Sequence, residues 1–186
     1  MNATELEMAE ALLDFWFSEE VAERWFRSTP QFDEQLRQDY EGLVQKALSG
    51  ELLHWQEDPR ASLALVILLD QLPLNIYRGK PQSFAGEAMA RVIAAMVIDK
   101  GWDRMLSDKQ KAFLYLPFMH SENPVDQERS VELYREAGLT DNLRWAEHHR
   151  SIVQRFGRFP HRNTILGRPS TDEERAWLAS DEAFRG

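Results

Sequence analysis

The sequence predicts an all-α protein. Helix-start signals, in which a capping side chain precedes apolar residues at a spacing of three or four, recur along most of the chain. Alternating, β-branched runs bounded by hairpin turns, which would indicate strands, are absent from the sequence. Because most connections between the expected helices are short, about eight to ten helices should pack as antiparallel neighbours.

Each expected helix begins at a polar capping residue. A side-chain oxygen at this position accepts a hydrogen bond from a backbone amide that the first helical turn leaves free. The signals are the capping boxes at Thr4 and Ser107, the cap–proline pairs at Thr29, Asp58 and Asn123, and the caps at Ser18, Ser83, Thr140 and Thr171. They predict a first helix over about residues 5–17, helix ends at Gly50, Gly138 and Gly157, and a last short helix after Thr171.

The helix expected over about residues 59–72 is apolar on nearly every face, so other helices should surround it. Its apolar run, residues 63–69, is far shorter than the roughly 18 residues that a membrane span needs. Pro73 should end this helix, and residues 72–81 should form a connector.

Asp70 directly follows the apolar run, so its carboxylate is expected inside or beside the core. It should be largely buried and bound to a cation or to helix-end amides, with Arg78 as one candidate partner. The alternative is a buried acid that faces a pocket.

The composition excludes several kinds of site. The chain has 186 residues, which fits one domain over residues 1–186, and no cysteine, which excludes disulfides, thiolate metal sites and cysteine nucleophiles. Its first residues carry acids where a secretory signal would carry lysine or arginine, which favours the cytoplasm. The net charge of −9 argues against general nucleic-acid binding. No membrane association and no cofactor are expected.

Positive charge is concentrated near the C-terminus. Between Arg144 and Arg168 the chain carries six arginines and the single acid Glu147, a net charge of +5. Three of the five histidines lie in the same segment and could add charge, namely His148, His149 and His161. This segment is therefore the first place to expect an anion-binding site.

Four strings of the sequence resemble one family. They are DFWFSEE with the following RWF, LLDQLPLNIYRG, YLPFMHSENPVDQERSVELY, and HHRSIVQRFGRFPHRNTILGRPSTDEE. In this order they resemble the uncharacterised, mostly bacterial domain-of-unknown-function family nine-two-four over almost the whole chain. The resemblance implies antiparallel helical hairpins in a compact α-α superhelix similar to tetratricopeptide-repeat proteins, and it implies no established activity. The family usually has arginine at the position of Leu74, so a cationic contact of the family could be missing here.

His120 and Glu122 follow Pro117, where a helix is expected to break. Their spacing is that of the H-x-E segment of zinc deaminases, but the cysteine ligands of those enzymes cannot exist in this chain. A metal site formed by His120, Glu122 and His161 is chemically possible, yet the paired histidines of common zinc motifs are absent. No metal is therefore expected.

The helix that ends at Gly157 has two stripes of residues at helical spacing. The inner stripe comprises Trp145, His149, Ile152 and Phe156, and the outer stripe comprises Arg144, His148, Ser151 and Arg155. His149 should therefore face inward, which favours a hydrogen-bonded core residue over a ligand or a base.

Residues 155–163 form the best candidate site. Phe156 and Phe159 should be buried anchors, and Pro160 should stiffen the turn that follows the helix. Polar groups are expected to project around these anchors. These polar groups are Arg155, Arg158, His161, Arg162 and Asn163. Arginine forks suit a carboxylate or a phosphate. The same groups could instead satisfy helix-end carbonyls and bridge acids such as Asp70 or Glu122, and the segment would then be a structural clamp.

Two functions follow. The favoured one is a binding or interaction protein whose cationic groove accepts an acidic small molecule or an acidic peptide. Its expected ligand-binding residues are Arg78, His120, Arg155, Arg158, His161, Arg162 and Asn163. The alternative is a small hydrolase or transferase that acts on an anionic substrate, with His149 or His161 as acid or base and Asp70 or Glu122 as the group that orients it. A serine nucleophile elbow and a phosphate-binding glycine loop are both absent from the sequence.

Overall fold

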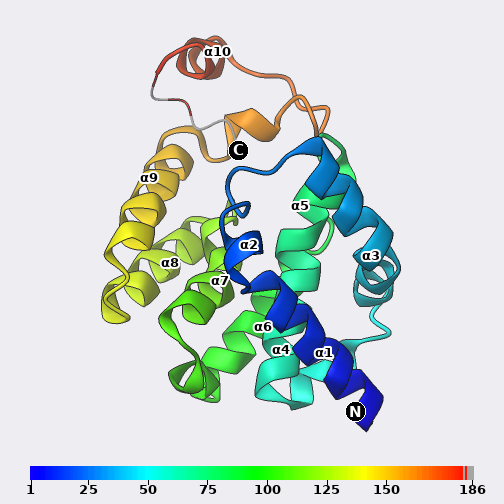
Figure 1. Cartoon of the computed structure of the whole chain (residues 1–186). Coiled ribbons are helices and arrows are strands. Elements are labelled where there is room, and N and C mark those ends of the chain that lie inside the picture. Colours follow the sequence, from blue (N-terminus) through cyan, green and yellow to red (C-terminus); the bar gives the residue numbers. More distant parts are fainter. Residues whose placement is uncertain (182, 184–186) are drawn as a thin grey trace. The chain divides into compact units, whose positions relative to one another are not determined.

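The structure is a computed structural model that describes residues 1–181 and 183. The secondary structure of these residues is helical, without a strand, which confirms the all-α class (Figure 1). The likeness to a tetratricopeptide-repeat superhelix stays a prediction. Throughout the described ranges, every helix is too short or too polar to span a lipid bilayer.

The described chain forms two compact units. Unit 1 comprises residues 1–78 and 82–117, and unit 2 comprises residues 79–81 and the chain from Phe118 onward. Each unit is considered separately below, and the single domain expected over residues 1–186 stays a prediction.

Unit 1 is a set of helices around α4. Its helices are α1 (Ala3–Trp16), α2 (Glu19–Ala22), α3 (Pro30–Leu48), α4 (Pro59–Val66), α5 (Leu72–Ile76), α6 (Glu87–Asp99) and α7 (Asp108–Met119), the last residues of which belong to unit 2. Three short 3-10 turns accompany them at Leu53–Glu57, Pro81–Phe84 and Trp102–Met105. Helix α4 packs against α1 and α6, and α3 packs against α5. The central position predicted for α4 is confirmed, since its residues from Ala61 onward are buried.

Most of the predicted capping residues are confirmed. The side chains of Ser18, Thr29, Asp58, Ser107, Asn123 and Thr171 all accept a hydrogen bond from a backbone amide in the first turn of their helix. Three predictions were wrong. Helix α1 is capped by Asn2 rather than Thr4, α6 begins after Gly86 rather than Ser83, and Thr140 is the first residue of its helix rather than the cap.

Two prolines lie inside helical segments that they were expected to end. The helix of α4 continues through a π-helical turn, Ile67–Gln71, into α5, where Pro73 lies in the first turn. Pro117 lies within α7, which continues to Met119. Proline removes one backbone donor and crowds the carbonyl four residues earlier. At Pro73 the wider π turn accommodates this crowding. A π turn pairs residues five apart instead of four, so the carbonyl four residues before the proline is not held in α-helical position.

The carbonyl four residues before Pro73 belongs to Leu69, and it lies against Gly86. A Cβ atom at position 86 would lie 2.2 Å from the Leu69 carbonyl oxygen, well inside van der Waals contact. The φ of Gly86 is −91°, so glycine is required here by the close backbone approach rather than by its torsion angle.

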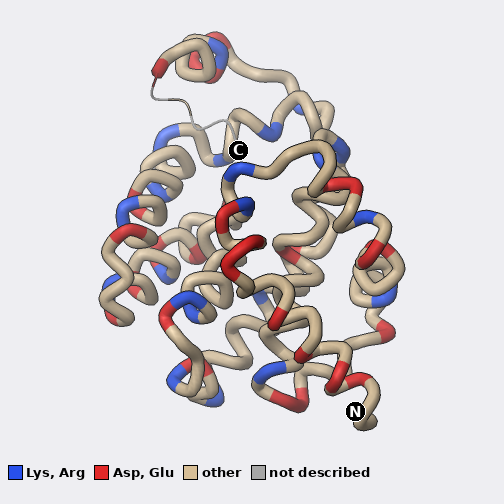
Figure 2. The backbone as a smooth tube through the Cα atoms, in the orientation of Figure 1, with Lys and Arg blue, Asp and Glu red and all other residues tan. Residues whose placement is uncertain are grey.

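Unit 2 contains the helices that carry the cationic segment. They are α8 (Pro124–Glu136), α9 (Thr140–Phe156) and α10 (Asp172–Leu178), with a 3-10 turn at Pro160–Arg162 between α9 and α10. Helices α8 and α9 pack closely against each other, and a short turn at Gly138 joins them. Basic and acidic positions are interspersed along both helices (Figure 2). The pairs Arg150–Glu128, at 2.9 Å, and Arg135–Glu147, at 3.5 Å, cross between them.

Candidate functional site

The segment after α9 turns sharply and returns to the core of unit 2. Gly157 ends α9 in a left-handed conformation, with a φ of 69° that few other residues adopt readily. Phe159 is completely buried and packs in an apolar cluster with Ile152, Val153 and Trp177. Phe156 is only partly buried against this cluster. Phe159 is therefore the anchor that was predicted, and Phe156 is a lesser one.

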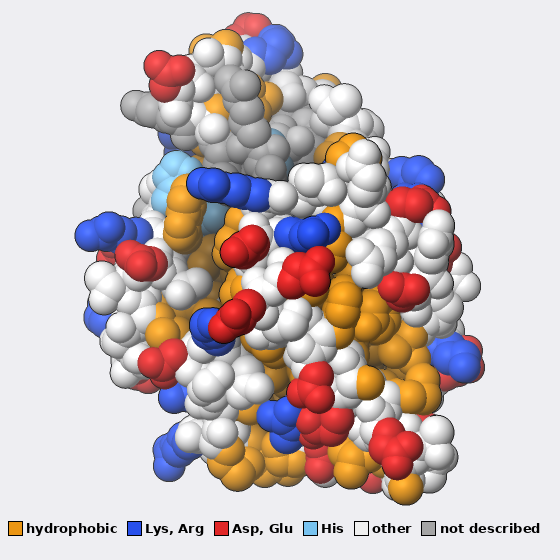
Figure 3. All heavy atoms as spheres, viewed as in Figure 1, with side chains coloured by type: hydrophobic (Ala, Val, Ile, Leu, Met, Phe, Trp, Pro, Cys, Tyr) orange, Lys and Arg blue, Asp and Glu red, His pale blue; other side chains and the backbone are white. Residues whose placement is uncertain are grey.

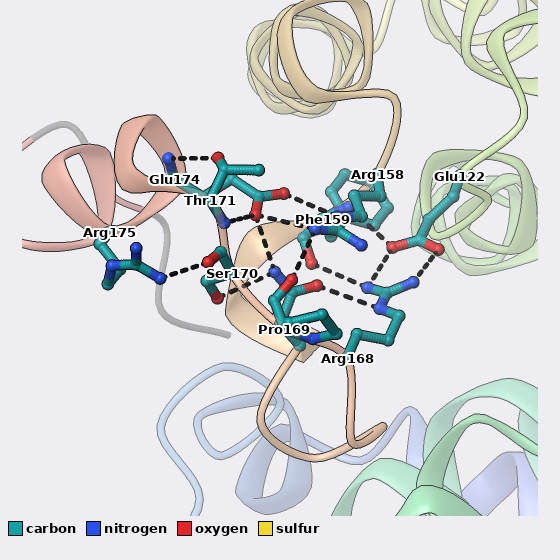
Figure 4. A network of polar contacts seen from close by, with 10 residues as sticks. Glu122, Arg158, Phe159, Arg168, Pro169, Ser170, Thr171, Glu174 and Arg175 are labelled. Carbon is teal, nitrogen blue, oxygen red and sulfur yellow. Dashed lines mark hydrogen bonds and ion pairs between the residues drawn. The ribbon is translucent and has the colours of Figure 1, made fainter.

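Glu122 joins the beginning of this segment to its end. Its carboxylate accepts hydrogen bonds from the amide of Phe159, at 2.7 Å, and from both terminal nitrogens of Arg168, at 2.7 and 2.9 Å (Figure 4). Burial alone would raise the pKa of Glu122, but the hydrogen bonds from Arg168 and Phe159 outweigh it and lower that pKa. Glu122 thus binds Arg168 and the backbone amide of Phe159 directly, and its negative charge also acts to raise the pKa of His161.

Arg158 forms a second clamp with Glu174, which is 2% exposed. The two guanidinium nitrogens of Arg158 lie 2.6 and 2.9 Å from the two Glu174 oxygens, and one of them also donates to the Pro169 carbonyl (Figure 4). Glu174 also accepts from the Thr171 amide, as the capping box of α10 requires, and from the Asn163 side chain. The Arg158 hydrogen bond is the main cause that lowers the pKa of Glu174 to about 2.

Arg162 and Asn163 are also built into the fold. Arg162 is 6% exposed, and its guanidinium carbon lies 4.9 Å from the centre of the Phe159 ring. Asn163 is fully buried, donates to Ser170 and Glu174, and accepts from Arg168. Most of the predicted anion-binding residues in this loop therefore support the clamp interpretation that was left open.

Arg155 is different because it lies on the surface. Its guanidinium lies 2.9 Å from Glu173 and 4.8 Å from the centre of the Phe156 ring. The side chains of Arg155 and Glu173 are 48% and 62% exposed. Solvent screens such a pair strongly, so it holds Arg155 only weakly.

Two histidines pack against the same aromatic ring. The ring centres of His149 and His161 lie 5.5 and 5.6 Å from that of Phe159. His149 is buried as predicted, and its Nδ1 donates to the Trp145 carbonyl at 2.8 Å. Burial is the main cause that lowers the pKa of His149 to about 3 and that of His161 to about 4, so both imidazoles are neutral near pH 7.

His120 is half-buried and contributes to lowering the pKa of His149 and of His161, since all three rings would carry the same charge. His120, Glu122 and His161 were considered above as a possible metal site. The described residues include no group of three or more histidine, aspartate or glutamate side chains placed to hold a metal ion.

The inner stripe predicted on α9 is partly wrong. His149 and Ile152 are buried, but Trp145 is 53% exposed. The outer stripe is as predicted, because Arg144, Ser151 and Arg155 are exposed and His148 is half-buried. The ring of His148 lies edge-on to that of Trp145, with the centres 6.0 Å apart.

Asp70 and Arg78 belong to unit 1 and do not form the pair that was considered. Asp70 is completely buried, as predicted, and accepts a hydrogen bond from the side-chain amide of Gln71 at 2.5 Å. Arg78 instead binds Asp33, with nitrogen–oxygen distances of 2.7 and 3.2 Å. Asp33 also accepts from Asn75 at 2.8 Å. Leu74, at the position of the usual family arginine, is half-buried.

A hollow on the surface of unit 2 lies between α9 and α10 and has a volume of about 410 Å³. This groove, called the α9–α10 groove below, is lined by His148, Ser151, Ile152, Arg155, Phe156 and Trp177. Histidine side chains are visible at the molecular surface in Figure 3. In this groove, apolar side chains from both helices lie next to the guanidinium of Arg155 and the imidazole of His148. A hollow of the same volume beside Phe26 in unit 1 is lined by Ala22, Glu23, Phe26 and Arg27, and none of these is a predicted site residue.

Several residues that build the site had no signal of their own in the sequence. The sequence places Glu173 and Glu174 in the first turn of α10. It does not indicate that Glu173 would bind Arg155 or that Glu174 would bind Arg158. Arg168 was counted only as charge. Trp177 was expected on a short helix, with no indication that it would face α9.

The fold and the site define a class of all-helical protein in which an arginine-rich loop is clamped by acids beside an exposed groove. The chain belongs to the family described as "Bacterial protein of unknown function (DUF924)", whose model matches residues 12–182. A solved structure of a protein of unknown function from Agrobacterium tumefaciens is 39% identical to this chain. The match covers 94% of this chain and 98% of that one, with a TM-score of 0.88. No curated protein matches the sequence.

Proposed function

We propose that the protein binds an acidic ligand in the α9–α10 groove. The observation that carries the proposal is the combination of Arg155 with an apolar floor in one open hollow of about 410 Å³. Binding sites for small molecules and peptide side chains commonly pair apolar surface with a few well-placed polar groups. In this groove, Ile152, Phe156 and Trp177 supply the apolar surface, and Arg155 supplies the positive charge.

Arg155 is the arginine of the loop that a ligand can engage at little cost. Its pair with Glu173 is exposed on both sides, and such pairs are worth roughly 0–1 kcal/mol, so a ligand carboxylate can replace Glu173. Arg158 is bound to Glu174, which is almost fully buried. Taking Arg158 away would leave the shielded Glu174 carboxylate without its cation, which is unfavourable.

The proposal therefore assigns different roles to the arginines near the C-terminus. Arg158, Arg162 and Arg168 hold the loop in place, and they do not line the groove. His148, beside Arg155 in the groove, can donate a further hydrogen bond to an anion.

We also propose a cytoplasmic location and a superhelix similar to tetratricopeptide-repeat proteins, on the sequence arguments given above.

The test uses phenylacetate as a probe, with uncharged phenylacetamide as its matched control. Both are titrated at constant ionic strength, and binding is followed by NMR shifts of the Trp177 indole. We expect phenylacetate to bind more tightly than the amide. Arg155→Gln should weaken phenylacetate binding about tenfold or more, because a hydrogen bond to a charged group is worth roughly 1.5–3 kcal/mol.

Two further variants sharpen this test. Arg135→Gln removes the same charge from a similarly exposed arginine on α8, and it should leave the affinity for phenylacetate unchanged. Glu173→Gln removes the competing carboxylate and should strengthen binding. The proposal is wrong if phenylacetate binds no better than phenylacetamide, or if Arg155→Gln and Arg135→Gln have the same effect.

A further inference from the structure

The exposed face of α9 continues beyond the groove. The groove residues His148, Ser151 and Arg155 are followed toward the N-terminal end of the helix by Arg144 and Trp145. Residues three or four apart lie on one side of a helix, so Arg144 shares a face with the groove residues. Arg144 has a side-chain exposure of 78%, and Trp145 is 53% exposed.

We infer that the natural ligand of the α9–α10 groove is an acidic peptide segment of a partner protein that also binds Arg144 and Trp145. This inference rests on the proposed function and names the chemical class of its ligand. The surface formed by Arg144, Trp145, His148, Ser151 and Arg155 is called the α9 stripe below.

The length of the α9 stripe favours a peptide over a small carboxylate. At a rise of 1.5 Å per residue, the backbones of Arg144 and Arg155 are about 16 Å apart along the helix. A small carboxylate that lies in the groove against Arg155 cannot also reach Arg144. An extended peptide advances about 3.3 Å per residue and its side chains alternate between two faces. Two acids four residues apart therefore lie on one face about 13 Å apart, and the long arginine side chains can cover the remaining distance.

The chemistry of the stripe also fits a peptide. Tryptophan and arginine are among the residues enriched where a few side chains supply most of the binding energy of a protein interface. The stripe presents a tryptophan between two arginines, with the apolar groove next to it. Its matching partner is a segment with an acid at each end and an apolar side chain between them.

Both arginines are available at little cost. The pair between Arg144 and Asp141 has a nitrogen–oxygen distance of 4.0 Å, and the two side chains are 78% and 96% exposed. Like the Arg155–Glu173 pair, it is strongly screened by solvent and can be replaced by a carboxylate of the partner.

The test compares two acetylated peptides of one composition. The first has glutamates at positions 1 and 5 with phenylalanine at position 3, so that all three side chains share one face of the extended chain, and the second has the glutamates at positions 1 and 3 with phenylalanine at position 5. Binding is measured by fluorescence anisotropy with wild type and with Arg144→Gln, Trp145→Ala and Arg135→Gln. All four proteins are also titrated with phenylacetate.

We expect the first peptide to bind at least fivefold more tightly than the second. Arg144→Gln and Trp145→Ala should each weaken the first peptide at least fivefold and leave phenylacetate binding unchanged, while Arg135→Gln should change neither. Trp145→Ala keeps the backbone carbonyl that His149 binds, and equal melting temperatures will show that the fold is intact.

Two outcomes overturn the inference, and they can be told apart. If phenylacetate binding depends on Arg155 but peptide affinity depends on neither glutamate spacing, Arg144 nor Trp145, the ligand is a small acid and only the inference is wrong. If phenylacetate binding does not depend on Arg155, the proposed function is wrong and the inference falls with it.

Discussion

Arg168 binds both carboxylate oxygens of Glu122, and the same guanidinium donates to the carbonyl of Phe159 at 3.2 Å. Since Glu122 also accepts from the amide of Phe159, the two charged residues hold both backbone groups of the buried anchor. The side chains of Arg168 and Glu122 are 24% and 27% exposed, so this pair is shielded from water more than the exposed pairs of α9 are.

Arg168→Ala should therefore lower the free energy of unfolding by about 2 kcal/mol, the scale of hydrogen bonds to a charged group. Urea denaturation measures this change. Arg135→Ala, which removes an exposed arginine, is the control and should cost less than about 1 kcal/mol. Equal losses in the two variants would show that the clamp contributes no more than a surface pair.

Phe159→Ala should lower the free energy of unfolding by about 3 kcal/mol or more, because it removes a fully buried ring from a packed cluster. Phe156→Ala should cost less, since that ring is only partly buried. Thermal and urea unfolding of the two variants will rank them. An unchanged melting curve for Phe159→Ala would mean that the loop is not docked on α9.

Gly86→Ala should destabilise unit 1. The added methyl group would lie 2.2 Å from the Leu69 carbonyl oxygen, and the contact is with backbone, which cannot rotate away. Overpacking of this kind costs about 1–3 kcal/mol. Gly42→Ala, where a methyl group meets no atom within 4 Å, is the control and should not destabilise the protein. A Gly86→Ala variant as stable as wild type would contradict the close approach.

Stability should fall as the pH is lowered from 7 to 5. His149 has its pKa lowered from 6.5 to about 3 in the fold, so the unfolded chain takes up this proton and the folded one does not. Stability then rises with pH across that interval, and His149 contributes about 2 kcal/mol between pH 6.5 and pH 5. His161 acts in the same direction, with a pKa of about 4.

Glu174 adds a second phase at lower pH. Its pKa is lowered from 4.5 to about 2, so its contribution is present above pH 4.5 and is lost as the pH falls toward 2. Urea unfolding at several pH values separates the two phases. His149→Leu should flatten the change between pH 7 and pH 5, and a change as steep as in wild type would show that His149 is not buried in its neutral form.

Local sequence signals predicted much of the fold. Caps such as Thr29 and Asp58 act within one helical turn, so the residues that decide them are adjacent in the chain. The prolines were misread because their effect depends on more distant groups. Pro73 is tolerated where a π turn and Gly86 accommodate the Leu69 carbonyl, and no local pattern reports that arrangement.

The candidate site was predicted less completely for the same reason. The arginines and the buried histidine could be found from charge and helical spacing. Their partners could not, because Glu122 lies 46 residues from Arg168, and Glu174 lies 16 residues from Arg158. Which arginine remains on the surface is decided by those acids, and so the groove could be located only in the folded chain.

The π-helical turn at Ile67–Gln71 also has a consequence for how unit 1 tolerates changes in length. A π turn contains one residue more than an α turn, and one residue rotates a helix face by about 100°. This extra rotation lets α4 pack against α1 and α6 while α5, further along the same continuous helix, packs against α3. Deleting one residue within 67–71 would rotate α5 by about 100° relative to α4, and it would turn Ile76 away from its buried position. The irregular turn thus acts as a fixed angular offset between two stretches of a single helix, and a change of length inside it would be felt by the packing of both.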